Sequence, residues 1–191
     1  MPEAVRLLRQ EHANMAMLLD VLDRQLAAAQ AGGRLDYDIV KAVLDYFLSY
    51  PDIYHHPKED LIYLRLRARD SAKAEGLAEL LSGHEELALL TRRFARATVD
   101  HILNPGDARR QWFISLGRNF VDTNRRHMAQ EEEHFIPLAL RVLAAQDWAD
   151  IDAQITDRED PLFGGTVELR FRDLHQMILD LERDSLESRP A

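Results

Sequence analysis

The sequence contains no cysteine among its 191 residues. This absence excludes disulfides, thiolate metal sites, iron–sulfur clusters and cysteine nucleophiles. Glycine and proline are scarce, with eight and seven residues, which is too few for a turn-rich β protein or a linker-rich chain. Basic residues are also outnumbered, 24 against 33 acidic ones, and the net charge is −9. Because nucleic-acid binding needs a basic face, we expect no nucleic-acid partner.

Long apolar runs are missing as well. No stretch of about 18 uncharged apolar residues occurs, so we expect no membrane span. The N-terminus lacks the basic start and apolar run of a signal peptide, and we therefore expect a cytoplasmic protein. The length fits one domain with a small appendage, and a homodimer stays open as its assembly.

Apolar residues recur at helical spacing through most of the chain. Breaks separate four long amphipathic segments at Gly32–Gly33, Asp70–Ser71 and Asn104–Pro105–Gly106. We expect Pro51 and Pro57 to kink the second helix rather than end it, because each removes one helix hydrogen bond. Short loops make neighbouring helices antiparallel, so the sequence predicts an all-α, up-down-up-down four-helix bundle over residues 1–146. Residues 147–191 are expected to form an extension, irregular over 148–165, with a short helix at about 166–186 that packs on the bundle.

A faint internal repeat relates the two halves of the bundle at an offset of 72 residues. Its clearest members are polar residues that interrupt the apolar stripes, and they form three pairs: His12 and His84, His55 and His127, Glu59 and Glu131. Histidines that follow one another along the chain lie at nearly equal distances from the loop between them, at Gly33, Asp70 and Pro105. In an antiparallel bundle, equal distance from a shared loop means equal height. We therefore expect all four histidines in one inward-facing layer, with each glutamate one turn along on the same face.

These six side chains predict a metal centre. Four imidazoles and two carboxylates suit two divalent cations, each taking two imidazoles while the carboxylates bridge or cap them. Mixed imidazole and carboxylate ligation favours iron, with zinc and manganese as alternatives. Buried carboxylates without a cation would be costly. The structural alternative, two buried His–Glu ion pairs at i, i+4, leaves His12 and His84 unexplained.

Two further histidines lie close to these residues in the sequence. His56 precedes Glu59 by three residues and is a candidate seventh ligand. Its partner at the repeat offset is Met128, so the repeat does not support this role. His134 follows Glu131 by three residues on the same helix face, and we expect it at the rim of the site.

The other polar candidates lie outside the pattern. His101 and His175 match neither the repeat nor the predicted layer, and we expect them on the surface. Asp60 and Glu132 directly follow the two candidate glutamate ligands. We expect each either to be exposed or to accept a hydrogen bond from a ligand imidazole.

On these residues the sequence resembles the hemerythrin-like, HHE cation-binding domains over roughly residues 3–145. Four motifs carry the resemblance: Gln10-Glu11-His12, His55-His56-Pro57-Lys58-Glu59-Asp60, Gly83-His84-Glu85 and His127-Met128-Ala129-Gln130-Glu131-Glu132. The resemblance implies a non-haem di-iron centre with oxo or hydroxo and carboxylate bridges. By residue match, its ligands are His12, His55, Glu59, His84, His127 and Glu131.

The motifs depart from those of the oxygen-carrying hemerythrins at two places. Those proteins have a second histidine four residues after the ligand on the third helix, where this sequence has Ala88. They also have a His-x4-Asp arrangement on the fourth helix, where this sequence has His-x3-Glu. The ligand set is closer to that of the repair-of-iron-centres proteins, whose cysteine-bearing domain these residues lack. A similar set occurs in an iron-sensing F-box protein, and no F-box is present either.

The resemblance implies a protein that reacts with or senses dioxygen, peroxide or nitric oxide, in the stress response or in iron handling. The alternatives are reversible oxygen binding or iron sensing without catalysis, and a structural bundle with a zinc-filled site. A carboxylate in place of a histidine makes iron more electron-rich, which favours oxidation over reversible oxygen carriage. No general base is separable from the ligand set, so a sensor or redox protein fits better than a classical enzyme.

Overall fold

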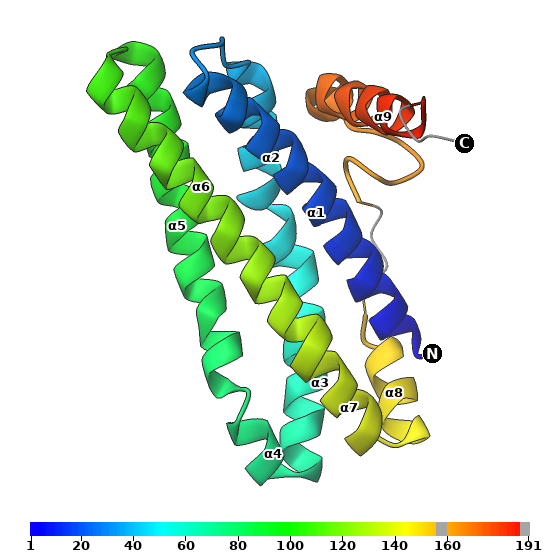
Figure 1. The fold of residues 1–191 in the computed structure, drawn as a ribbon. Coiled ribbons are helices and arrows are strands. Elements are labelled where there is room, and N and C mark those ends of the chain that lie inside the picture. The colour runs from blue at the N-terminus through cyan, green and yellow to red at the C-terminus, as the bar shows by residue number, and fades with distance from the viewer. Residues whose placement is uncertain (156–159, 188–191) are drawn as a thin grey trace.

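Four long helical segments run side by side in up-down-up-down order (Figure 1). The structure is a computed structural model that describes residues 1–155 and 160–187, without the side chains of residues 79, 81 and 181–187. All regular structure in these residues is helical, and no strand occurs among them. None of the described helices is both long and apolar enough to cross a membrane. The predicted all-α bundle is confirmed.

The first and third segments are single helices, α1 (Glu3–Gln30) and α5 (Ala78–Leu103). The second consists of α2 (Tyr37–Phe47), the π turn η1 (Pro51–His55) and α3 (His56–Arg69). The fourth consists of α6 (Asp107–Gln130), the π turn η2 (Glu131–Phe135) and α7 (Ile136–Val142). The short helix α4 (Ser71–Glu75) lies between α3 and α5.

The two π turns lie where the second and fourth segments pass the middle of the bundle. In each, the closing backbone N–H reaches a carbonyl five residues back, at His56 to Pro51 and at Ile136 to Glu131. Pro57 and Pro137 follow the two turns. A proline ring lacks an N–H and clashes with the carbonyl four residues before it, so a regular α-helical turn does not fit there. The wider π turn accommodates the ring while the chain keeps its direction. The expected kink in the second segment therefore takes the form of a π turn.

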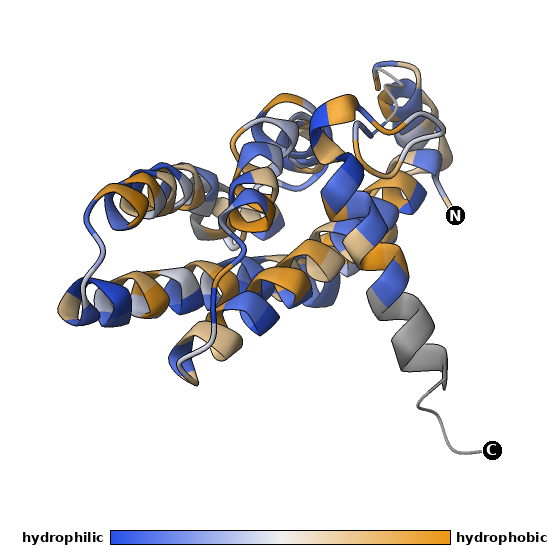
Figure 2. Ribbon diagram, turned by 90° about the horizontal axis from the view of Figure 1, so that it is seen from above, coloured by the Kyte–Doolittle hydropathy of each residue, from blue (hydrophilic) through white to orange (hydrophobic). Residues whose placement is uncertain are grey.

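The apolar core consists of two clusters. The larger packs α1, α2, α5 and α6 around aromatic residues such as Phe94 and Phe120. The smaller packs the start of α1 against α3, α7 and α8 around Leu8 and Phe135. Hydrophobic and hydrophilic residues alternate along the long helices in Figure 2, as amphipathic helices require. Between the two clusters lies a layer of buried polar residues, which the apolar packing shields from water.

The extension beyond residue 146 contacts the bundle, and it contains more helix than expected. The expectation of irregular structure is wrong for residues 148–152, which belong to α8 (Ala145–Asp152). Asp147 accepts a hydrogen bond from the backbone N–H of Ala144 at 2.8 Å, and Trp148 is buried against the bundle. The last helix begins later than predicted, as η3 (Leu169–Phe171) followed by α9 (Arg172–Glu187). Residues 156–159 of the predicted irregular stretch lie outside the described residues.

Helix α9 lies beside α1 and α2 (Figure 1). Asp160 joins the segment that leads to it to the bundle. One carboxylate oxygen accepts hydrogen bonds from the Tyr46 hydroxyl at 2.8 Å and the Asn14 amide at 3.3 Å. The other oxygen caps the backbone N–H groups of Leu162 and Phe163. The division of the chain at residue 146 remains a prediction.

Candidate metal centre

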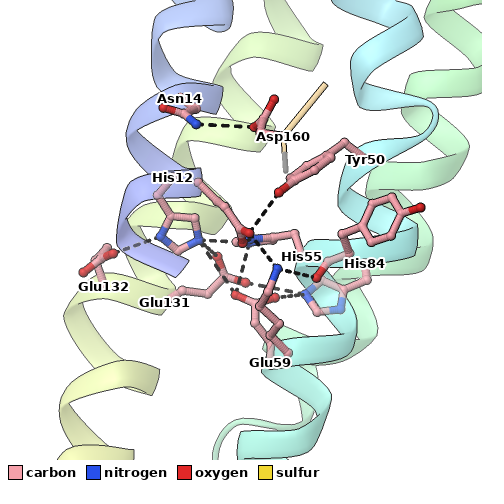
Figure 3. A network of polar contacts seen from close by, with 12 residues as sticks. His12, Asn14, Tyr50, His55, Glu59, His84, Glu131, Glu132 and Asp160 are labelled. Atoms are coloured by element: carbon pink, nitrogen blue, oxygen red, sulfur yellow. Dashed lines mark hydrogen bonds and ion pairs between the residues drawn. The ribbon is translucent and has the colours of Figure 1, made fainter. Parts of the chain in front are cut away.

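The polar layer contains all six predicted ligands together with His56. Helix α1, the two π turns and α3 bring together one fully buried group: His12, His55, Glu59 and Glu131. A second group lies beside it and consists of His56, His84 and His127. In each group the potential ligand atoms all lie within 4.8 Å of one another. Figure 3 shows the first group converging from different helices, with His84 of the second group beside it.

The two glutamates of the first group lie between its imidazoles and those of the second group. Glu59 Oε1 lies 3.4 Å from His55 Nε2, whereas its Oε2 lies 3.2 Å from His84 Nε2. The two oxygens of Glu131 also contact different groups: Oε2 lies 3.2 Å from His12 Nε2, and Oε1 lies 2.8 Å from His127 Nε2. Each carboxylate thus presents one oxygen to each group of imidazoles.

Several of these atoms are buried without a hydrogen bond of acceptable geometry. They are both carboxylate oxygens of Glu59, Oε2 of Glu131 and Nε2 of His127. Buried polar atoms are normally paired, and unpaired ones call for an explanation. Because they are lone-pair donors that converge with the other imidazoles, the residues present fit a bound cation.

The buried carboxylates and imidazoles of the candidate centre shift one another's pKa values. Burial acts to lower the pKa of His12, but the carboxylates of Glu131 and Glu132 outweigh it and raise that pKa to about 11. Burial also acts to lower the pKa of His84, but the carboxylates of Glu131 and Glu59 outweigh it and raise this pKa to about 9. Burial and the neighbouring carboxylate act to raise the pKa of Glu131, but the surrounding imidazoles lower it to about 2. Without a metal, protons therefore balance the buried carboxylates.

Comparison with protein-family models matches residues 3–139 to the Hemerythrin HHE cation binding domain. The chain belongs to this family. The family resemblance and the hemerythrin-like bundle are thereby confirmed, with the additional helices following the matched region. Comparisons with curated proteins and with solved structures gave no significant match.

His56 departs from the repeat of this hemerythrin-like domain, yet it lies at the centre. Its ring stacks on that of His84, with centroids 3.9 Å apart and planes 9° apart. Burial and the positive charges of His84 and His55 lower the pKa of His56 to about 3. A neutral imidazole has a free lone pair, so His56 can serve as a third nitrogen ligand in its group.

Residues outside the two groups hold the imidazole of His55 in place through hydrogen bonds. His55 Nδ1 lies 2.8 Å from Glu11 Oε2, and Glu11 also accepts hydrogen bonds from Lys58 and Tyr50. No sequence pattern assigned a role to these three residues. Their only signal was position, since Glu11 and Lys58 each directly precede a predicted ligand.

Glu132 fulfils one of its two expected roles. Its Oε1 lies 2.9 Å from His12 Nδ1, and its Oε2 accepts a hydrogen bond from Arg9 at 3.1 Å. Asp60, for which the same two roles were open, is exposed. His134 is exposed too and joins neither group of potential ligands.

The prediction of a surface position is wrong for the two histidines outside the pattern. His101 is buried and its ring stacks on Phe113, with centroids 5.0 Å apart. It faces the core because it lies on the inner side of α5, next to the aromatic residues of α6. His175 is half-buried, and its Nδ1 lies 3.1 Å from the carbonyl oxygen of Leu162. It packs within the extension.

A small cavity of about 20 Å³ lies next to the candidate centre. Its walls include His55, His56, His127 and Glu131, and apolar residues such as Phe47 and Leu87 form much of the remainder. A space of this size holds about one water molecule. The cavity can therefore take a small ligand beside the imidazoles, but not an organic substrate.

Proposed function

We propose that this protein binds two metal ions in one centre. His12 and His55 would ligate the first ion, and His56, His84 and His127 the second. Glu59 and Glu131 would bridge the two ions. The observation that supports this proposal most directly is the position of the two carboxylates: in each, one oxygen lies near an imidazole of the first group and the other near an imidazole of the second.

We propose iron as the metal, because imidazole and carboxylate together suit ferrous and ferric iron. Bound iron would supply one-electron chemistry and an affinity for small diatomic molecules. The chain itself would hold the imidazoles in place and keep the centre dry between its two apolar clusters. The cavity of about 20 Å³ restricts the reacting molecule to the size of dioxygen, peroxide or nitric oxide. The proposed function is therefore reaction with, or sensing of, these molecules.

Metal analysis with absorption spectroscopy tests this proposal. The metal-free chain would be reconstituted with ferrous iron without air and then exposed to oxygen, peroxide or nitric oxide in separate samples. We expect about two iron ions per chain and charge-transfer absorption that changes with each added molecule. Iron bound without any spectral response would contradict a redox or sensing role. Zinc as the only metal in the native protein would support a structural bundle.

Reversible oxygen binding is a second candidate because of one observation. The sequence ranks it lower, because a carboxylate in place of a histidine makes iron more electron-rich and favours oxidation. Oxygen carriers also have a histidine where this chain has Ala88. In the structure His56 supplies a third imidazole to the same group and lines the cavity beside Ala88. The group thus contains three imidazoles without a histidine at residue 88. Repeated cycles of oxygenation and deoxygenation without net oxidation would favour this candidate over redox chemistry.

A further inference from the structure

We propose that Glu11 and Glu132 make the two metal positions unequal, by holding His55 and His12 so that their shared position binds metal more tightly than the position of His56, His84 and His127. This inference rests on the proposed function, since it concerns the two positions of the same centre. It adds an order to them: the His12–His55 position fills first on loading and empties last on removal.

The first position is supported by two matching chains of contacts. In one, Arg9 contacts Glu132 at 3.1 Å and Glu132 contacts His12 Nδ1 at 2.9 Å. In the other, Lys58 contacts Glu11 at 2.6 Å and Glu11 contacts His55 Nδ1 at 2.8 Å. Both imidazoles of this position therefore have a carboxylate behind them, and a cation anchors each carboxylate.

These contacts determine what the opposite nitrogen can do. A carboxylate accepts a hydrogen bond and cannot donate one, so Nδ1 of each ring must carry a proton. In the neutral ring the lone pair then lies on Nε2, which in both residues faces the other group members: the two Nε2 atoms are 3.1 Å apart. The same hydrogen bond makes the ring a stronger ligand and fixes its orientation.

The second position has weaker support. His56 Nδ1 lies 3.2 Å from Asp52, whose side chain is 41% exposed and therefore in contact with water. Among the residues with described side chains, no carboxylate contacts Nδ1 of His84 or His127. Among the described side chains, only one of the three imidazoles here, that of His56, has a carboxylate behind its Nδ1, whereas both imidazoles of the first position have one.

The burial of Glu11 and Lys58 agrees with a positioning role. Their side chains are only 7% and 8% exposed, and a buried ion pair contributes little net stability by itself. Glu11 also accepts a hydrogen bond from Tyr50 at 3.1 Å, so three donors fix its carboxylate. We infer that the fold maintains this costly arrangement to orient His55.

A cobalt titration of the metal-free chain tests the order of the two positions. Cobaltous ion reports ligation by its visible absorption, and a competing chelator gives the affinity of each binding event. The wild-type chain is expected to show two unequal events. Glu11→Gln and Glu132→Gln should each weaken the tighter event by roughly 10–100-fold and leave the weaker one nearly unchanged. Asp52→Asn should affect only the weaker event.

The outcomes separate this inference from the proposed function. Fewer than two cobalt ions in the wild-type chain would contradict the proposed function itself. Two equal events, or two unequal events that neither glutamine variant changes, would overturn only the inference. An equal loss at both positions would assign the two glutamates a general structural role.

Folding controls keep the test decisive. Asp20→Asn removes a surface carboxylate that contacts Arg125; it lies eight residues after His12 on α1, is 58% exposed and contacts no candidate ligand, so it should change neither event. Circular dichroism of each metal-free variant checks helix content. If Glu11→Gln fails to fold because its site is buried, Glu132→Gln still tests the proposal, since that side chain is 32% exposed.

Discussion

The rings of His56 and His84 stack face to face, with centroids 3.9 Å apart. Burial and the positive charge of His84 lower the pKa of His56 to about 3. The carboxylates of Glu131 and Glu59 outweigh burial at His84 and raise its pKa to about 9. Near neutral pH the metal-free pair therefore contains one neutral and one protonated ring, and the neutral ring is ready to bind a metal.

Replacing His56 tests whether it is a ligand. We expect His56→Ala to weaken metal binding at one of the two positions by at least roughly tenfold, since even losing an outer hydrogen-bond partner typically costs that much. The visible spectrum of bound cobalt should change as well, because the ion loses a nitrogen donor. Cobalt titration with a chelator measures both effects.

His134→Ala is the matched control for this variant. His134 is another histidine close to the candidate ligands in the sequence, but its side chain is exposed and outside both groups. It should leave the affinity and the spectrum unchanged. An unchanged cobalt spectrum in His56→Ala would show that His56 packs beside the centre without ligating.

The sequence predicted the six paired residues of the centre because they keep one offset and one height. It could not decide the role of His56, because consecutive residues of an α-helix point about 100° apart. In the structure, the π turn η1 ends at His55, and both His55 and His56 reach the centre. The sequence did contain Pro57, but a proline alone indicates a kink and not its geometry.

Other features depend on contacts between distant segments, and local patterns do not encode them. Glu11 precedes His12 on α1, and its partners Tyr50 and Lys58 come from the second helical segment. Helix α8 is short, and burial of Trp148 against the bundle stabilises it more than its own periodicity does. The bundle itself was predictable, because its long helices have strong apolar stripes and clear breaks.

Metal binding near neutral pH should release protons. The metal-free chain holds protons on His12 and His84, whose pKa values are about 11 and about 9, and a ligating nitrogen must lose its proton. Calorimetric titration with zinc at pH 7, repeated in buffers of different ionisation enthalpy, measures the number released. Heats that do not depend on the buffer would contradict this ionisation of the metal-free centre.

The stability of the metal-free chain should fall as the pH rises from neutral. His84 has its pKa raised from 6.5 to about 9, so its contribution is complete below pH 6.5 and is lost as the pH passes about 9. The pKa of His56 is lowered to about 3, so its contribution decreases instead as the pH falls below 6.5. Together these shifts favour a maximum close to pH 6.5.

Urea denaturation between pH 5 and pH 10 measures this dependence, with the zinc-saturated chain as the comparison. Zinc replaces the protons on the ligating nitrogens, so the loaded chain should lose much less stability on the alkaline side. A metal-free chain that is as stable at pH 9 as at pH 6.5 would contradict the prediction.

The contact between Asp160 and Tyr46 should make the extension part of the same cooperative unit as the bundle. Asp160→Ala removes the acceptor for the buried Tyr46 hydroxyl and the cap on the residues after it, and should cost about 1–3 kcal/mol of unfolding free energy. Tyr46→Phe removes one hydrogen bond together with its donor and should cost less. Asp173→Asn, on the exposed side of α9, should change little.

Urea denaturation gives these free energies, and hydrogen exchange locates the change. In Asp160→Ala the amides of α9 should exchange faster than in the Asp173→Asn control, because the segment that leads to α9 has lost its attachment to α1 and α2. A double variant with Tyr46→Phe should cost less than the sum of the two, since both remove the same hydrogen bond. If Asp160→Ala unfolds like the control with unchanged exchange in α9, the apolar contacts of α9 hold the extension without this carboxylate.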